Sequence, residues 1–517
     1  MKLEDFQLEL TQVCGVMPVW QGRVNAQQWR TTCQQVSDKG GRLVALWGTD
    51  DRDRGAGFAV RAALAVQSGL LVMKLPLGGL GFPDVSDIFR AANRMQRAVY
   101  DLFGVGAENA ADRRKWLRHA AWPADAFPLR KDFSGHWSPV TGHSGEADGY
   151  PFVRVDGEGV HEIPVGPVHA GTIEPGHFRF SIVGEGILRL EERLGYKHKG
   201  IEKRFESMTL AGGARLAGRV SGDSTVAYAW AYAMAVEGVT GTTPPERALW
   251  LRALLLERER VGQHLWDLGF MGNDAGLAFG LAQFSRLRED WLRTSHALFG
   301  HRYLMDTIVP GGVACDIDGA GISRIRREAD VIGRTVALLR EIYVEHAGLQ
   351  DRFVDCGRIR PDVASRLGLT GVAGRASGLG NDLRVRFPCS PYDRLGVNMT
   401  VRTGGDVAAR ATVRVEEIME SLRLIGVLLS DLPGGDIASP LPAAPEHALG
   451  IGWVEGWRGE ILIALETGAD NRIRRLHPHD PSWQNWPVLE RAVLGNIVPD
   501  FPLINKSFNL SYSGHDL

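Results

Sequence analysis

Three side chains that can carry protons lie close together in one segment rich in glycine and proline. His169, Glu174 and His177 fall within nine residues of the stretch VGPVHAGTIEPGHFRFSIVGE. Because its glycines and prolines exclude a regular helix, the segment is expected to form a loop that can direct these side chains into a cavity. There a histidine, or a glutamate with a raised pKa, can pass protons. The alternative interpretation is a turn whose polar groups are simply solvated.

A second polar group comes directly before the most apolar stretch of the chain. Arg219, Ser221, Asp223 and Ser224 precede VAYAWAYAMAV at residues 226–236. A carboxylate or a hydroxyl at such a place is typical of a helix N-cap. We therefore expect Asp223 or Ser224 to accept a backbone N–H of the first turn.

Sequence motifs for several common cofactors are missing. Glu259 and His264 are five residues apart in LLLERERVGQHLWDLG, so they do not form the HExxH zinc arrangement. No GxGxxG follows a strand-like run and no Walker motif occurs, so no nucleotide-binding loop is predicted. The stretch GRASGLGNDLRVRFP brings Asp382, Arg384 and Arg386 together, a pattern that a surface loop held by salt bridges also shows.

The composition excludes several classes of protein. The 517 residues are 44% hydrophobic and 23% charged, which indicates a folded protein of two or three domains. A net charge of −2 argues against a general nucleic-acid binder. The apolar run at residues 226–236 is too short to span a bilayer, and the acidic start MKLEDFQLEL is unlike a signal peptide. The five cysteines contain no CxxC pair, which predicts no disulfide framework and fits a reducing, cytoplasmic setting.

Two domains joined by a connector are expected to position these residues. Residues 1–133 combine strand-like runs such as RLVALWG with a helical stretch at residues 84–104, and the glycine-rich residues 134–162 are expected to be an exposed connector. After a strand-like opening at residue 163, helices are expected at residues 223–237, 245–268, 323–346 and 407–432, and a β-hairpin near residues 452–465. The predicted fold class is therefore α+β, with a small α+β domain before a large, mainly α-helical domain at residues 163–517.

Seven segments, in order along the chain, resemble one protein family. They are GPVHAGTIEPGHFRF, LGYKHKGIEK, GRVSGDSTVAYAWAYAMAVE, LLLERERVGQHLWDLG, RASGLGNDLR, TGGDVAARATVRVEEI and NKSFNLSYSGHDL. The second domain thereby resembles the large subunit of membrane-bound hydrogenases of the hydrogenase-4 and formate hydrogenlyase type, and the forty-nine-kilodalton subunit of respiratory complex I. The first domain resembles the thirty-kilodalton subunit of complex I through QRAVYDLFGV and FPLRKDF, although Gln96, Arg97 and Ala98 replace its usual acidic-basic-acidic lead.

The departures from the hydrogenase pattern decide which function the resemblance implies. In the hydrogenases, two CxxC pairs hold nickel and iron through soft thiolates. The corresponding positions here would be Ser221, Ser224, Ser511 and Gly514. Serine hydroxyls are poor ligands for these metals and glycine offers no side chain. We therefore expect no metal in this chain and no activation of hydrogen.

The resemblance implies instead the complex I-like use of the same cavity. There a quinone headgroup would bind beside a 4Fe-4S cluster held by a neighbouring subunit. His169 matches the loop histidine that contacts the headgroup, Glu174 matches a proton-relay glutamate, and Gly222 stands where complex I has a tyrosine. The expected catalytic residues are His169, Glu174, Arg219 and Asp223, and the expected acceptor cavity includes His169, Ser221, Gly222, Asp382 and Arg384.

The expected function is that of an electron-transfer subunit in an NADH:quinone oxidoreductase-like complex that couples electron transfer to proton movement. It would lie peripherally on the cytoplasmic face of the inner membrane. Its implied partners are an iron–sulfur small subunit, a quinone-channel-type membrane subunit and antiporter-like membrane subunits. The alternative is a catalytically silent subunit that only joins the iron–sulfur arm to the membrane subunits.

Overall fold

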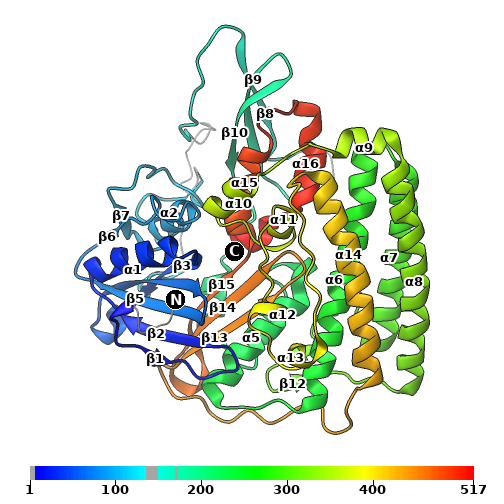
Figure 1. Cartoon of the computed structure of the whole chain (residues 1–517). Coiled ribbons are helices and arrows are strands. Elements are labelled where there is room, and N and C mark those ends of the chain that lie inside the picture. The colour runs from blue at the N-terminus through cyan, green and yellow to red at the C-terminus, as the bar shows by residue number, and fades with distance from the viewer. Residues whose placement is uncertain (1–5, 120–121, 136–148, 169–172) are drawn as a thin grey trace.

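The computed structural model describes residues 6–119, 122–135, 149–168 and 173–517. Its N-terminal unit is built on a five-stranded sheet of order β1-β2-β5-β4-β3, in which only β2 and β5 pair in parallel (Figure 1). Its strands are β1 (Thr11–Gln12), β2 (Val19–Arg23), β3 (Arg42–Asp50), β4 (Phe58–Val66) and β5 (Gly69–Leu77). The strand β4, FAVRAALAV, lies between β5 and β3 and is buried along its whole length; apart from Arg61 its residues are small or apolar.

Two helices of this unit, α1 (Ala26–Asp38) and α2 (Ala92–Phe103), pack against the sheet. The helix expected at residues 84–104 forms only from Ala92 on. The reason is Gln96, whose side chain accepts a hydrogen bond from the N–H of Val85 (3.0 Å) and donates one to Asp84 (2.6 Å). These bonds hold the preceding residues in turns. Two short parallel strands, β6 (Gly81–Pro83) and β7 (Gly106–Glu108), complete the unit.

A three-stranded antiparallel sheet projects at the top of Figure 1 and opens the second unit. It consists of β8 (Val160–Val165), β9 (His177–Val183) and β10 (Gly186–Arg193). Part of the expected connector, residues 136–148, lies outside the described residues. In its described part, Tyr150 receives a hydrogen bond from Arg97 (2.8 Å) and lies under the guanidinium of Arg193. The strand β8 begins inside the range expected to be connector.

Long helices form the body of the second unit (Figure 1). They are α6 (Glu246–Asp274), α7 (Ala278–Phe299), α8 (Gly319–Glu345) and α14 (Val407–Ser430). The helix α5 (Thr225–Thr240) is buried on all sides and packs on an antiparallel sheet of β13 (Leu449–Glu455), β14 (Glu460–Thr467) and β15 (Ile473–His479). Gly452 makes this approach close, since a Cβ there would lie 2.6 Å from the carbonyl carbon of Ala231. The four expected helices and the hairpin are confirmed, with ends that differ by a few residues.

Shorter elements complete the second unit. They are α3 (Ile201–Phe205), α4 (Gly213–Ala217), η3 (Gly222–Ser224), α9 (Ala347–Phe353), α10 (Pro361–Leu367), α11 (Gly371–Ala376), α12 (Leu383–Arg386), α13 (Tyr392–Leu395), α15 (Ser482–Ala492), α16 (Phe501–Phe508), α17 (Tyr512–Asp516) and the strands β11 (Ile308–Val309) and β12 (Gly312–Val313).

The two units meet where β15 lies against β3. The rings of Trp47 and His477 are stacked with centroids 5.2 Å apart, and Gln484 donates to the carbonyl of Val44 (2.6 Å). Buried ion pairs also cross this junction. The predicted α+β class, with a small mixed unit before a mainly helical one, is therefore confirmed.

Candidate functional site

The start of α5 meets the C-terminal segment at the four positions that the resemblance assigns to metal ligands, Ser221, Ser224, Ser511 and Gly514. The hydroxyl oxygens of Ser221 and Ser511 are hydrogen-bonded at 2.8 Å, although 290 positions separate them in the sequence. Ser511 also accepts the N–H of Gly514 (2.8 Å) and thereby caps α17. These hydroxyls bond to one another and to neighbouring groups, and they form a polar cluster.

Arg458, in the turn between β13 and β14, places its guanidinium beside this cluster. It donates to Asp223 Oδ2 (2.5 Å) and to the hydroxyl of Ser224 (3.3 Å), and it stacks on the ring of Trp457. Asp223 also accepts the hydroxyl of Ser221 (2.6 Å). Burial alone would raise the pKa of Asp223, but Arg458 and Ser221 outweigh it and hold that pKa below its ordinary value. Asp223 is therefore ionised at neutral pH.

Asp480 occupies the space beside the fourth ligand position. Its carboxylate accepts the hydroxyl of Tyr228 (2.8 Å) and the N–H of Ser482 (2.9 Å). A Cβ on Gly514 would lie 2.6 Å from the carboxyl carbon of Asp480, and closer still to one of its oxygens. Only glycine fits there without movement, so the residues present do not fit a nickel–iron centre. Among the described residues, no group of three or more His, Cys, Asp or Glu side chains is arranged to hold a metal ion.

The start of α5 is not capped as expected. Ser224 stands at the N-cap position, yet neither its side chain nor that of Asp223 bonds to the first turn, because Arg458 engages both. The expectation of an Asp223 or Ser224 cap is therefore wrong. Instead Glu259, from α6, accepts the N–H groups of Val226 (2.7 Å) and Ala227 (3.3 Å).

Glu259 is also the group at this site whose pKa suits proton transfer. Burial raises its pKa to about 8, with a contribution from the negative charge of Asp223, while the two backbone N–H groups oppose the shift. In the sequence, Glu259 is notable only for its spacing from His264. Spacing in the sequence does not single out Glu259, Arg458 or Asp480, because each of them reaches the cluster from a distant part of the chain.

Glu174 also binds the C-terminal segment. It accepts hydrogen bonds from both the N–H (2.9 Å) and the hydroxyl of Ser513, and Lys197 Nζ lies 3.5 Å from it. His177 points elsewhere, with its ring bonded to the carbonyl of Gly166 (3.1 Å). The expected headgroup ligand, His169, lies outside the described residues, and its role stays a prediction.

Arg219 is half-buried and Gly222 is exposed, and neither joins the polar cluster. Arg219 forms a two-bond ion pair with Asp306 (2.6 and 2.7 Å). Gly222 has only the methyl group of Met305 near the place of a Cβ. The catalytic and cavity roles expected of these two residues therefore receive no support from direct contacts among the described residues.

Asp382 and Arg384 belong to a separate, buried network of charges. Arg384 bonds to Asp382 (2.7 Å) and to Glu257 (3.0 Å). The alternative interpretation of a surface loop is therefore wrong for these two side chains. The structure does not bring them into contact with Asp223.

This network nevertheless extends toward the polar cluster. Arg375 joins Glu455 (2.8 Å) to Glu417 (2.7 Å), and Glu417 bonds to His264 (2.8 Å). The ring of His264 packs edge-on against Trp457, whose indole N–H donates to the carbonyl of Asp223 (2.8 Å). Packed rings therefore bridge the buried network and the cluster.

An apolar cleft of about 360 Å³ opens beside the cluster. Asn509 belongs to both, since it lines the cleft and its carbonyl accepts Arg458 Nε. Asn509 and Lys506 form the polar end, where Asn509 donates to Asp267 (2.7 Å) and burial lowers the pKa of Lys506. The other lining residues are mostly apolar: Val165, Ile173, Phe178, Phe270, Asn273, Asp274, Phe501, Pro502, Asn505, Leu510 and Tyr512. Such a cleft suits a ligand with an apolar body and a polar head.

Family comparisons agree with this architecture. Residues 23–138 match the family model described as respiratory-chain NADH dehydrogenase, 30 Kd subunit, and residues 274–450 match respiratory-chain NADH dehydrogenase, 49 Kd subunit. Formate hydrogenlyase subunit 5 of Escherichia coli (strain K12) is 31% identical over 92% of this chain and 85% of its own length. Hydrogenase-4 component G of the same organism is 31% identical over 92% of this chain and 84% of its own.

A solved structure shares the fold and belongs to a membrane complex. One chain from the membrane-bound sulfane sulfur reductase, an archaeal respiratory membrane complex, superposes with a TM-score of 0.66 at 25% identity, over 70% of this chain and 99% of that one. In the described part of the present chain, no helix has the length and apolar character needed to cross a membrane.

Proposed function

Because the chain belongs to the family of fused 30- and 49-kilodalton complex I-type subunits, together with formate hydrogenlyase subunit 5 and hydrogenase-4 component G, we propose that it is the acceptor-binding redox subunit of a membrane-associated complex. Its relatives are subunits of redox complexes of the hydrogenase and NADH–quinone oxidoreductase kinds. The acceptor in our proposal is a quinone-type carbonyl compound that binds in the apolar cleft.

One observation supports this proposal most directly. Arg458, Asp223 and Asp480 lie beside the positions that the resemblance assigns to the metal ligands of hydrogenases, and this charged group borders an apolar cleft. A carbonyl oxygen gains negative charge as it is reduced, and fixed cationic donors stabilise that charge in a site shielded from water. Arg458 at the cluster and Lys506 at the polar end of the cleft are the cations that could act in this way.

The proposed reaction balances with two electrons and two protons per quinone. The electrons would arrive from a 4Fe-4S cluster in the neighbouring small subunit. Glu259, with its pKa near 8, binds the first turn of α5 beside the cluster, and Glu174 binds Ser513 of the C-terminal segment, so these two acids are the proposed proton donors. The product is a quinol, which leaves through the cleft.

The remaining parts of the complex are proposed from the family. They are the iron–sulfur small subunit, a quinone-channel-type membrane subunit and antiporter-like membrane subunits, with this chain on the cytoplasmic face. The buried network from His264 to Arg384 would respond to charge changes at Asp223, because packed rings join the two. Such a response would couple electron transfer to proton movement.

The test is reoxidation of the reduced complex. The complex is purified through a tag on this chain, its iron–sulfur clusters are reduced with dithionite, and their reoxidation by a short-chain ubiquinone and a short-chain menaquinone is followed by stopped-flow absorbance. Arg458→Ala and His169→Ala are each expected to slow reoxidation at least about tenfold, the size expected when one charge-assisted hydrogen bond to the reacting oxygen is lost. Arg340→Ala, an equal loss of charge at an exposed position on α8, is the control.

The competing function is that of a silent linking subunit. It is favoured by the way in which Ser221, Ser511 and Gly514 satisfy one another without a ligand. Equally slow reoxidation in the wild-type, Arg458→Ala and His169→Ala complexes would overturn the redox proposal and establish the linking role.

A further inference from the structure

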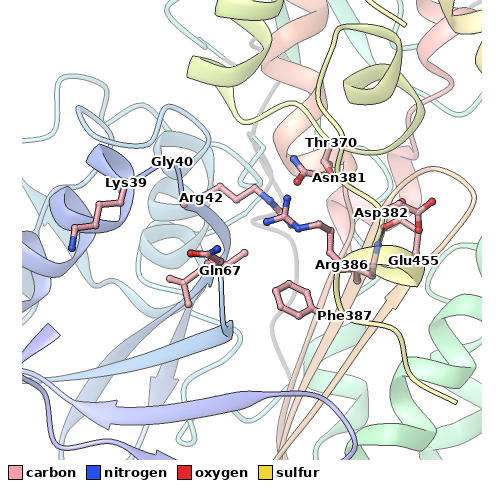
Figure 2. A pocket seen from close by; sticks show the side chains of 14 residues that line it. Lys39, Gly40, Arg42, Gln67, Thr370, Asn381, Asp382, Arg386, Phe387 and Glu455 are labelled. Carbon is pink, nitrogen blue, oxygen red and sulfur yellow. Dashed lines mark hydrogen bonds between the residues drawn. The ribbon is translucent and has the colours of Figure 1, made fainter. Parts of the chain in front are cut away.

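A second cavity, of about 230 Å³, lies between the two units of the chain (Figure 2). We call it the interdomain cleft. One wall is formed by the turn between α1 and β3 and by the turn between β4 and β5, and the other by residues that follow α10 and by α12. It takes no part in the proposed acceptor site. Its volume is below the roughly 300–1,000 Å³ of pockets for drug-sized ligands, which favours a small ligand.

Two arginines from opposite walls point toward one another across this cleft (Figure 2). Arg386, from α12, is exposed, and its side chain makes no hydrogen bond or ion pair with any residue that the structure describes. Arg42 begins β3 on the other wall. Burial lowers the pKa of Arg42 to about 10, an effect that Glu455 opposes and the positive charge of Arg386 reinforces. Two facing guanidinium groups repel one another unless an anion lies between them.

The cleft also contains neutral donors without partners. Thr370 is only 3% exposed, yet its hydroxyl bonds to no described residue. The side-chain amide of Asn381 is likewise unpaired within the part of the chain that the structure describes. The hydroxyl oxygen is not one of the fully buried unpaired atoms, so it is open to the cleft, where a ligand can bond to it.

The acceptors that line the cleft are already engaged by other groups. Glu455 receives Arg375 (2.8 Å) and the N–H of Leu383 (3.1 Å), while Asp382 receives Arg384 (2.7 Å). The negative charges of Glu455 and Asp382 are therefore compensated by arginines that do not line the cleft.

Glu460 binds the two terminal nitrogens of Arg42 in a forked pair. A guanidinium has five N–H groups, so this pair leaves Arg42 with its Nε–H and two outer N–H groups. The cleft thus presents a surplus of donors and of positive charge.

We propose that the interdomain cleft binds a small oxyanion, the phosphate or carboxylate group of a soluble molecule, between Arg42 and Arg386, with Thr370 and Asn381 as further donors. Forked guanidinium groups match the geometry of both kinds of oxyanion. Since Arg42 belongs to one unit and Arg386 to the other, the bound anion bridges the units and stabilises their junction.

The experiment measures anion binding to the purified complex that contains the full chain. Inorganic phosphate and succinate are titrated separately by calorimetry and by thermal unfolding, at constant ionic strength set with chloride. The melting temperature of the wild type is expected to rise with at least one of the two, because a ligand of the folded state stabilises it. Arg386→Ala should weaken that binding about 10- to 100-fold, and Arg386→Lys less, because the lysine keeps the charge and loses the fork.

Arg386 is a suitable position because its side chain is exposed and unpaired, so its truncation removes no hydrogen bond or ion pair within the described chain. Arg340→Ala is the matched control and should bind like the wild type. Thr370→Val gives a second readout, since it removes the hydroxyl at nearly constant shape and should also weaken binding. Binding of only one of the two probes would identify the kind of oxyanion and support the proposal.

Two outcomes would overturn the proposal. One is equal stabilisation of the wild type and Arg386→Ala by both anions, which would show a general salt effect. The other is that neither anion binds the wild type and that the Arg386→Ala complex loses a subunit. Arg386 would then pair with an acidic side chain of a partner. Neither outcome depends on quinone reduction.

Discussion

Substitution of Gly514 by alanine tests whether the carboxylate of Asp480 fills the place of the missing fourth ligand. The new Cβ would lie 2.6 Å from the carboxyl carbon of Asp480 and 3.0 Å from Ser511 Oγ. Both distances are shorter than ordinary van der Waals contact, so Asp480 must move. The backbone at Gly514 is helical, so the effect comes from crowding and not from strained φ.

The magnitude follows from the contacts that the movement breaks. Overpacking of a filled site costs about 1–3 kcal/mol. The hydrogen bond from Tyr228 to Asp480 adds about 1.5–3 kcal/mol if it is lost altogether. Because partial movement relieves the clash before the bond is fully broken, we expect Gly514→Ala to lower the free energy of unfolding by about 2–4 kcal/mol.

The assay is denaturant unfolding of the purified chain, with Gly426→Ala as the control. Gly426 lies inside α14 with open space at its Cβ, so alanine there should stabilise the helix by up to about 1 kcal/mol. In an Asp480→Ala background the cost of Gly514→Ala should fall by at least about 1 kcal/mol, because the clashing group is gone. If Gly514→Ala is as harmless as Gly426→Ala, or if its cost is the same with and without Asp480, the reasoning is refuted.

Two further substitutions test the charges around this centre. The pKa of Glu259 is about 8 in the folded chain, against an ordinary value of 4.5. Between pH 4.5 and pH 8 the folded state therefore binds more protons than the unfolded state, and the free energy of unfolding falls as the pH rises. Glu259→Gln should flatten that part of the stability–pH curve, and an unchanged slope would contradict the raised pKa. At the junction of the units, Glu466 lies within 3.3 Å of the guanidinium groups of Arg61 and Arg474. Glu466→Gln should lower the free energy of unfolding by about 3 kcal/mol, because buried cations lose their partner. Glu246→Gln, which removes a charge from an exposed pair, should cost less than about 1 kcal/mol. Equal costs would rule out a structural role for the buried charge.

Local patterns predicted the helices and the hairpin, but not how their ends are held. The apolar run before Glu237 predicts α5, and the periodic stretch after Pro245 predicts α6. The late start of α2 depends on Gln96, which binds the segment before the helix. The start of α5 depends on Glu259, which lies more than thirty positions along the chain.

Sequence alone established the family segments and the absence of thiolates at Ser221, Ser224, Ser511 and Gly514, since residue type and order need no coordinates. Only the tertiary structure showed that Arg458 and Asp480 stand at those positions, and that Arg219 and Arg384 are held by other carboxylates. The physical reason is that helix and strand periodicity is written in neighbouring residues, whereas charge pairing depends on which distant side chains the packed core brings within bonding distance. Buried carboxylates such as Glu417 and Glu466 are each shared by two or more arginines, and the spacing of these arginines in the sequence does not say which of them bind.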